Sequence, residues 1–191
     1  MRRRSAEWQV LPDEIETARL KLRPIKLQDV DPIFESQSDP EWARYELLPA
    51  PFTRKDAERF VASMVLRDRK TNPVWVVTLG GEVIGTASMA SVKNWKIAAL
   101  GYGIHRRAWG QGFARETVGA VLDRSFAAYR QLRKVRAHTD PRNERSIRLL
   151  RRLGFTLEGT LRANQLNGRN EFVDEAVFGL LREEWPPKPS G

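Results

Sequence analysis

A strand, a glycine-containing turn and a helix follow one another without interruption between residues 96 and 129. The segment KIAALGYGI, residues 96–104, is short and apolar, as expected of a strand within a sheet. Gly110 and Gly112 follow in RRAWGQGFAR, residues 106–115, and apolar residues then recur at helical spacing. A strand that enters a helix through a tight turn indicates an α/β fold.

The backbone of this turn is suited to binding an anion. The first N–H groups of a helix have no intrahelical partner and carry partial positive charge. Glycine lets a backbone approach a phosphate closely and adopt positive φ, and Arg106 and Arg107 can add charge-assisted hydrogen bonds. The turn therefore suits a pyrophosphate, although a strand-to-helix turn can also need glycine for its geometry alone.

Two common phosphate loops do not fit the spacing. A dinucleotide-binding loop would have a third glycine where this chain has Arg115. A Walker A loop would continue with Lys-Ser or Lys-Thr, and neither pair follows here. The spacing therefore indicates neither hydride transfer nor phosphoryl transfer.

The remaining pattern predicts one mixed α/β domain over residues 14–185, with tails at 1–13 and 186–191. Further strands are expected at 18–25, 73–79, 82–92, 134–139, 155–163 and 171–181. Helices are expected at 27–38, 53–70, 112–129 and 143–154, with Thr53 as an N-cap and Gly154 as a C-cap.

Composition restricts the chemistry. The 191 residues include no cysteine and two histidines, so disulfides and thiol nucleophiles are excluded and we expect no metal site. No apolar run is long enough to span a membrane, and acidic residues follow the basic start MRRRS, so we expect a cytoplasmic protein. The net charge of +9 favours a polyanionic partner: nucleic acid, an acidic protein or a multiply phosphorylated cofactor.

Arg107, Gly110 and Gly112 match the pattern (Gln/Arg)-x-x-Gly-x-(Gly/Ala). This pattern resembles the coenzyme A pyrophosphate loop of the GNAT superfamily of N-acetyltransferases. The segments ETARLKLRPIKLQDVDPIFE, LGYGIHRRAWGQGFARE and NERSIRLLRRLGFTLEGTLR are similar to those of RimJ/RimL-type members, in the same order. The resemblance implies a single-domain GNAT fold, in which a mixed, largely antiparallel sheet of about seven strands has splayed central parallel strands and flanking helices.

The resemblance also implies the cofactor and its site. Acetyl-CoA would donate its acetyl group to a primary amine by direct transfer, and no metal would take part. Backbone groups of Tyr102 and Ile104 would hold the pantetheine arm, and Asn143 would contact the cofactor from the next helix. The amides that would hold the pyrophosphate belong to the turn and the first helical turn, namely Arg107, Trp109, Gly110, Gln111, Gly112 and Ala114.

Ser146 is the candidate catalytic residue. It shares an apolar stripe with Leu149, Leu150 and Leu153, and this periodicity alone fits a core serine that bonds back to the preceding turn. The resemblance instead implies that Ser146 stabilises the departing thiolate. The helix's arginines, Arg145, Arg148 and Arg152, are expected on the opposite face.

The resemblance supplies no general base. Relatives often carry glutamate where this chain has Ala99 and tryptophan where it has Gly103. Asp174 is either an acid that lines the acceptor cleft or a structural hydrogen-bond acceptor, and His105 is expected to be a surface histidine.

Several acceptors remain open. RimJ/RimL similarity implies a protein N-terminus, whose α-amino group has a pKa of about 7.7 to 8.0, with possible ribosome association. Polyamines and aminoglycosides are alternatives, but as cations they would need a locally acidic cleft on a chain of net charge +9. A non-catalytic CoA-sensing or RNA-associated module is a third reading. We expect a monomer or a homodimer.

Overall fold

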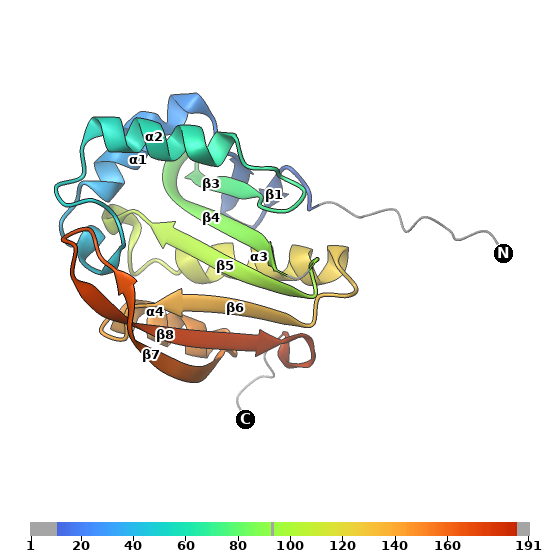
Figure 1. Cartoon of the computed structure of the whole chain (residues 1–191). Helices are drawn as coiled ribbons and strands as arrows, with labels where there is room; N and C mark the ends of the chain where they lie inside the picture. Colours follow the sequence, from blue (N-terminus) through green and yellow to red (C-terminus); the bar gives the residue numbers. More distant parts are fainter. Residues whose placement is uncertain (1–10, 93, 187–191) are drawn as a thin grey trace.

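The computed structural model describes residues 11–92 and 94–186, which form one eight-stranded sheet in the order β1-β2-β3-β4-β5-β6-β8-β7 (Figure 1). The strands are β1 (Ile15–Glu16), β2 (Leu20–Pro24), β3 (Val74–Leu79), β4 (Glu82–Val92), β5 (Ile97–Ile104), β6 (Lys134–Thr139), β7 (Thr156–Leu166) and β8 (Phe172–Leu181). The α-helices are α1 (Val30–Gln37), α2 (Arg54–Val65), α3 (Phe113–Ala128) and α4 (Glu144–Arg152). Four 3-10 turns complete the described elements: η1 (Leu27–Asp29), η2 (Ala43–Tyr45), η3 (Arg106–Ala108) and η4 (Arg182–Glu184).

The predicted α/β class with a largely antiparallel sheet is confirmed, and the sheet has one strand more than expected. Every neighbouring pair is antiparallel except β5 and β6. The additional strand, β1, has only two residues and pairs Ile15 with Leu22 of β2. A strand of two residues is too short to show an alternating pattern in the sequence, so β1 was not predicted.

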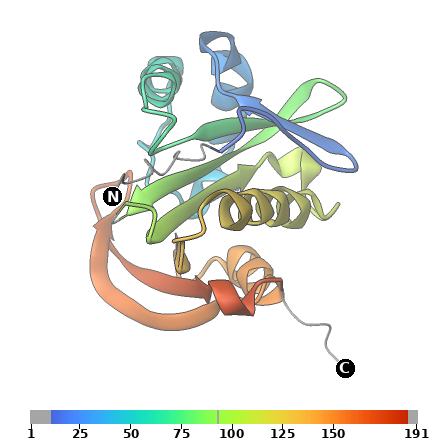
Figure 2. The same ribbon diagram turned by 90° about the vertical axis from the view of Figure 1, so that its right-hand side faces the viewer.

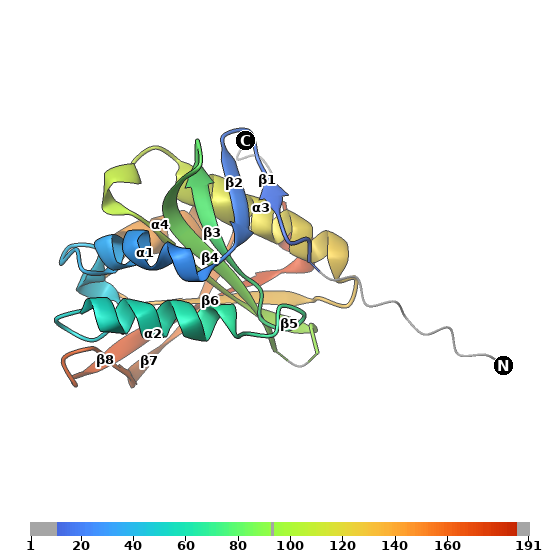
Figure 3. The ribbon, with the colours of Figure 1, turned by 90° about the horizontal axis from the view of Figure 1, so that it is seen from above.

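The helices cover both faces of the sheet. Val74 and Val76 of β3 belong to the apolar cluster that contains buried residues of α1 and α2. Trp75 and Val77, which alternate with them, belong to the larger cluster with α3 and α4. Figure 2 shows the two helix pairs on opposite sides of the strands, and Figure 3 shows α1 and α2 side by side. Burial on both faces explains the continuous apolar run VWVVTL in β3.

Two helix ends show how local chemistry sets the boundaries. Thr53 caps α2 in a reciprocal box with Asp56, as expected of an N-cap, but the helix ends at Val65 instead of residue 70. Beyond it, the Asp68 carboxylate accepts hydrogen bonds from the Lys70 amide at 3.0 Å and the Thr71 hydroxyl at 3.2 Å. This side-chain turn competes with the helix and ends it.

The parallel strands β5 and β6 separate towards their carboxyl ends. Their pairing stops at Leu100 and Ala137, whereas β5 stays paired to β4 as far as Ile104. The His105 amide donates to Ile84, so by the alternation of an antiparallel ladder the backbone groups of Tyr102 and Ile104 face away from β4. The predicted splay is therefore present, and it leaves backbone groups of β5 facing a gap.

The predicted tails lie mostly outside the described residues, which exclude 1–10 and 187–191. Leu11 is buried in the larger cluster, and its amide donates to the Tyr129 hydroxyl at 3.3 Å. Residues 11–13 thus pack against the domain expected to start at residue 14.

Candidate active site

A cavity of about 1210 Å³ occupies the gap between β5 and β6 and extends to both faces of the sheet. Its walls come from the end of β5, the turn before α3, α4, the segment around η2 and the β7–β8 hairpin. Most predicted site residues line it: Tyr102, Ile104, Trp109, Gly110, Gly112, Ala114, Asn143 and Ser146. Arg107 and Gln111 are not among the lining residues.

The turn before α3 presents its amides in a row. Gly110 and Gly112 have φ of 77° and 81°, a left-handed conformation that explains why glycine is needed at both positions. The first helical hydrogen bond runs from Glu116 to the Gly112 carbonyl. Within the described residues, the six amides of residues 110–115 donate to no protein acceptor. This part of the backbone can therefore bind an anion.

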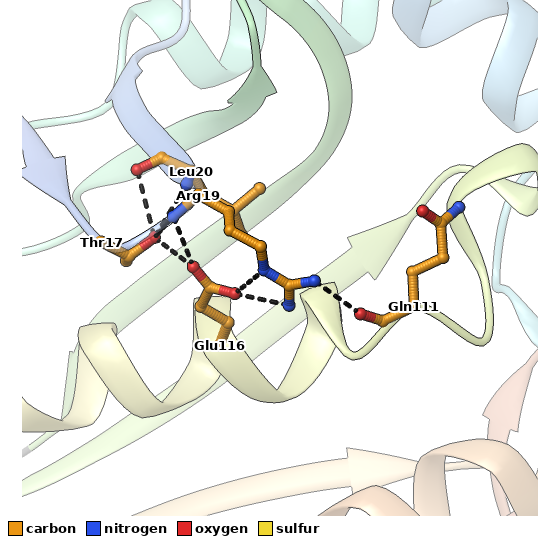
Figure 4. A network of polar contacts seen from close by, with 5 residues as sticks. All are labelled: Thr17, Arg19, Leu20, Gln111 and Glu116. Atoms are coloured by element: carbon orange, nitrogen blue, oxygen red, sulfur yellow. Dashed lines mark hydrogen bonds and ion pairs between the residues drawn. The ribbon is translucent and has the colours of Figure 1, made fainter.

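An ion-pair network outside the cavity holds this turn (Figure 4). Arg19 forms an ion pair with Glu116 at 2.6 Å, and its Nη1 donates to the Gln111 carbonyl at 3.1 Å. The Thr17 hydroxyl donates to the same Glu116 carboxylate at 2.6 Å. Because a trans peptide is planar, the Gly112 N–H points opposite to the Gln111 carbonyl and thus away from Arg19. The network therefore fixes the direction of one amide in the row.

The positive charge of the site comes from residues other than the expected ones. Arg106 pairs with Asp39 at 3.5 Å, and Arg107 pairs with Glu82 and donates to the Val83 carbonyl at 3.0 Å. Their guanidinium groups therefore already have partners. The cavity is instead lined by six other arginines: Arg44 of η2, Arg115 of α3, Arg142 before α4, and Arg145, Arg148 and Arg152 of α4.

The α4 arginines were expected on the face opposite the apolar stripe of Ser146, but they line the same cavity as Ser146 and Leu149. The arc of α4 next to the apolar stripe therefore also faces the cavity. The Arg145 guanidinium lies 3.9 Å from the centre of the Trp109 ring, a cation–π contact that joins α4 to the turn.

The Ile104 carbonyl accepts two indole hydrogen bonds, from Trp109 at 2.7 Å and from Trp42 at 2.9 Å. These two bonds occupy both lone pairs of this oxygen. The backbone of Tyr102 and the amide of Ile104 therefore remain for a ligand in the gap. Gly103 makes room for Trp42, because a Cβ there would lie 2.8 Å from the indole. Trp42 thus occupies the space beside Gly103.

Ser146 and Tyr102 join α4 to β5 inside the cavity. Their hydroxyl oxygens are 2.8 Å apart, and the Ser146 amide donates to Oδ1 of Asn143, the N-cap of α4, at 3.1 Å. Burial raises the pKa of Tyr102 to about 12, so its phenol stays neutral and can donate a hydrogen bond. Ser146 is therefore a polar group that faces the cavity rather than a core serine bonded back to its own helix.

His105 is not the surface residue that was expected. It is 3% exposed, and it does not line the cavity. Burial, together with the nearby Arg107 guanidinium, lowers the pKa of His105 to about 4. A neutral imidazole at this place cannot contact a ligand in the gap.

The other end of the cavity is acidic, in contrast to the turn. The acids that line it there are Glu41, Glu46, Asp140, Asp174 and Glu175. Two of them are paired with arginines that also line the cavity, Glu41 with Arg44 at 3.6 Å and Asp140 with Arg142 at 2.6 Å. Burial raises the pKa of Glu46 to about 7, and its carboxylate has no hydrogen-bond or ion-pair partner among the described residues. Glu46 follows η2 in a proline-containing segment without periodicity, so the sequence pattern gave no signal for it.

The β7–β8 hairpin closes the acidic end. The Gly168 carbonyl, in the turn between these strands, accepts from the Ala50 amide at 3.3 Å. Asp174 lines the cavity and also accepts from the Ala163 amide at 2.9 Å, so it is a structural hydrogen-bond acceptor in the cavity wall. Among residues 11–92 and 94–186, no three acidic or histidine side chains are grouped as metal ligands, and no helix is both long and apolar enough to cross a membrane.

Comparisons with known proteins agree with this geometry. Residues 19–156 match the family described as "Acetyltransferase (GNAT) domain". The uncharacterized N-acetyltransferase p20 of Bacillus licheniformis is 33% identical over 175 residues, covering 88% of this chain and 96% of the relative. The ribosomal protein uS5-alanine N-acetyltransferase of Escherichia coli is 31% identical over 108 residues, 56% of this chain and 55% of the relative. RimJ of Mycobacterium smegmatis, solved in complex with CoA-disulfide, shares the fold with a TM-score of 0.79 at 21% identity, covering 93% of this chain and 91% of RimJ.

Proposed function

The chain belongs to the GNAT acetyltransferases, and from this premise we propose that it transfers the acetyl group of acetyl-CoA to a protein N-terminal amine. The observation that carries the proposal is the row of six unpartnered amides, residues 110–115, at one end of a gap that leads past Ser146 to an acidic end. Such an arrangement suits a cofactor that is anionic at one end and reactive at the other.

The residues present fit coenzyme A. The amides of residues 110–115 would bind the pyrophosphate, and Arg145, Arg148 and Arg152 would add positive charge around it. Backbone groups of Tyr102 and Ile104 that face the gap would hydrogen-bond the pantetheine amides. Asn143, which caps α4 and lines the cavity, would lie on the other side of the arm.

Ser146 and Tyr102 would act on the sulfur. The thioester supplies an activated acetyl group, and its carbon–sulfur bond breaks as the amine adds to the carbonyl carbon. The departing thiolate needs a hydrogen-bond donor. The Ser146 and Tyr102 hydroxyls lie 2.8 Å apart. If Tyr102 donates its hydrogen to Ser146, the Ser146 hydroxyl is free to donate its own hydrogen to the thiolate. Ser146 is therefore assigned as a catalytic residue within this proposal.

The acidic end supports an acceptor that carries positive charge. Carboxylates there attract an ammonium group even on a chain of net charge +9. A protein N-terminus meets this requirement, and the uS5-alanine relative is named for such a substrate. A ribosomal acceptor would place the enzyme in the cytoplasm, beside the ribosome. Polyamines and aminoglycosides are the second candidate class, favoured by the same acids.

A release assay tests the proposal. CoA thiol is measured with acetyl-CoA and three panels: peptides with free N-termini, polyamines and aminoglycosides. Release with the peptides alone supports the proposal, whereas release with a small polycation alone assigns the second class. Acetyl-CoA should also raise the melting temperature, since it binds the folded state. Cofactor binding without release on any panel would contradict catalysis and indicate a CoA-binding module.

A further inference from the structure

We propose that His138 is the base that removes a proton from the incoming amine, and that Glu175 orients it. The inference rests on the proposed function, because it assigns a role within the same transfer. His138 lies at the end of β6, lines the cavity and exposes 34% of its side chain there. Ala99 has no ionisable group, so a base must come from another position.

A chain of contacts fixes the imidazole. Nδ1 of His138 lies 3.2 Å from Oε1 of Glu175. The Glu175 carboxylate is itself held by Gln165, which donates to Oε1 at 2.8 Å, and by Asn164, which donates to Oε2 at 2.8 Å. Glu175 is only 8% exposed, so these contacts replace water around a buried charge.

This contact also sets the tautomer. A carboxylate beside Nδ1 favours the imidazole that carries its proton on Nδ1. Nε2 then keeps a free lone pair, which is the site that can accept a proton. Glu175 also stabilises the imidazolium that forms, as the buried aspartate does in a Ser-His-Asp triad.

His138 lies on the face where an amine would enter. Side chains alternate between the two faces along a strand. Leu100 of β5 is paired with Ala137 of β6, so these two side chains lie on the same face. Tyr102 shares the face of Leu100, which is the face of α4 and Ser146. His138 follows Ala137 and therefore lies on the opposite face. The base and the sulfur-directed hydroxyls thus approach the gap from its two sides.

The proton balance is simple. An ammonium acceptor gives one proton to Nε2 of His138 and becomes a neutral amine. The amine nitrogen bonds to the thioester carbon, the carbon–sulfur bond breaks, and the second nitrogen proton ends on sulfur as CoA thiol. His138 then releases its proton to solvent. The products are an amide, CoA thiol and one proton.

Glu46 is the rival base, because it lines the same cavity and faces Tyr102. Its carboxylate lacks a partner among the described residues, so nothing there fixes its direction, whereas His138 is held through Glu175. Other ionisable groups surround His138. They are Arg136 on the same strand, Asp140 and its partner Arg142 in the loop after that strand, Asp174 on β8 and Tyr102 on β5.

The test uses the whole chain, acetyl-CoA and a peptide with a free N-terminal alanine. His138→Gln should lower kcat about 100-fold at pH 7, the size typical of the loss of a general base. It should also abolish the acid limb of the pH profile, which is the fall in kcat/KM at low pH. Its acetyl-CoA affinity should stay within twofold of wild type. Free imidazole should partly restore the turnover of His138→Gly. Glu175→Gln should lower kcat and leave the KM for acetyl-CoA unchanged, because the imidazole has lost the carboxylate that orients it.

The matched control is His105→Gln, which replaces the only other histidine of the chain, outside the cavity. Its acid limb should be retained, with folding checked by melting temperature. The inference is overturned if His138→Gln keeps wild-type turnover, or if Glu46→Gln abolishes the acid limb while His138→Gln keeps it. A wild-type protein that turns over no amine contradicts the proposed function, whereas turnover that survives His138→Gln contradicts the base assignment alone.

Discussion

The two ends of the cavity are built in different ways. The turn end consists of consecutive backbone amides, residues 110–115, whose direction is set by two glycines and one ion-pair network. The acidic end consists of side chains from distant segments, such as Glu46, His138 and Glu175. A site made of contiguous backbone depends on local conformation, whereas a site made of dispersed side chains depends on the whole fold. Mutations should therefore affect cofactor affinity at one end and turnover at the other.

The largest effect on cofactor affinity is expected at Gly112. Gly112→Val forces a β-branched residue into a left-handed conformation, which costs about 2 kcal/mol. If the variant turn relaxes and acetyl-CoA binding must restore the left-handed conformation, the affinity falls about 30-fold. Calorimetric titration measures this affinity. Gly80→Val is the matched control, because Gly80 has a φ of 57° in open space in the β3–β4 turn. The control should lose stability but keep its affinity, and an equal loss of affinity in both variants would contradict a local role for the turn.

Ser146→Ala should change the rate instead of the affinity. Removing one hydroxyl donor from the thiolate should lower kcat about tenfold, with the acetyl-CoA affinity nearly unchanged. Steady-state kinetics with a saturating acceptor measure the change. Leu149→Ala, on the same helix and also in the cavity wall, is the packing control. If Ser146→Ala keeps the wild-type kcat, Ser146 is not catalytic and serves only as a structural link to Tyr102.

Arg19→Ala tests whether the network outside the cavity directs the turn. It removes the bond to the Gln111 carbonyl and the ion pair with Glu116, which are partly exposed and together contribute about 1 kcal/mol. Acetyl-CoA affinity should fall about fivefold. Arg54→Ala, which breaks an exposed ion pair with Asp31 between α2 and α1, should leave the affinity unchanged. Equal affinities in the two variants would show that the turn holds its shape without Arg19.

The last effect concerns the stability of the folded protein, which should depend on pH through the acidic end. The folded protein keeps Glu46 protonated up to its raised pKa of about 7, whereas the unfolded chain loses this proton near the ordinary value of 4.5. Stability is therefore lost as pH rises from 4.5 to 7. Glu46→Gln should melt several degrees higher than wild type at pH 8 and equally at pH 4. Glu35→Gln, exposed on α1, should show no such difference.

The same contrast explains what the sequence could predict. The order of the main strands and helices follows from periodicity, and the positive φ of Gly110 and Gly112 agrees with the expected turn. The catalytic role proposed for Ser146 came from resemblance, because its position on the helix stripe alone favours a core serine. Asn143 was likewise placed by resemblance, and the structure makes it the cap of α4.

The acidic end was beyond sequence reasoning for physical reasons. Glu46 lies in an aperiodic segment, and its neighbour Tyr102 is 56 positions away along the chain. The β8 residue Glu175 meets His138 only because β6 pairs with β8, the strand that follows β7. The burial of His105 depends on how η3 folds against β5, so alternation along the strand did not indicate it.

The shared acceptor at Ile104 has a mechanical consequence. Trp42 comes from the wall near the acidic end and Trp109 from the turn, yet both indoles donate to this one oxygen. A displacement of the β5 terminus changes both bonds at once, while a displacement of either tryptophan alone breaks its own bond. A ligand that moves the β5 terminus therefore alters the position of both tryptophans, one at each end of the cavity, through the Ile104 carbonyl oxygen.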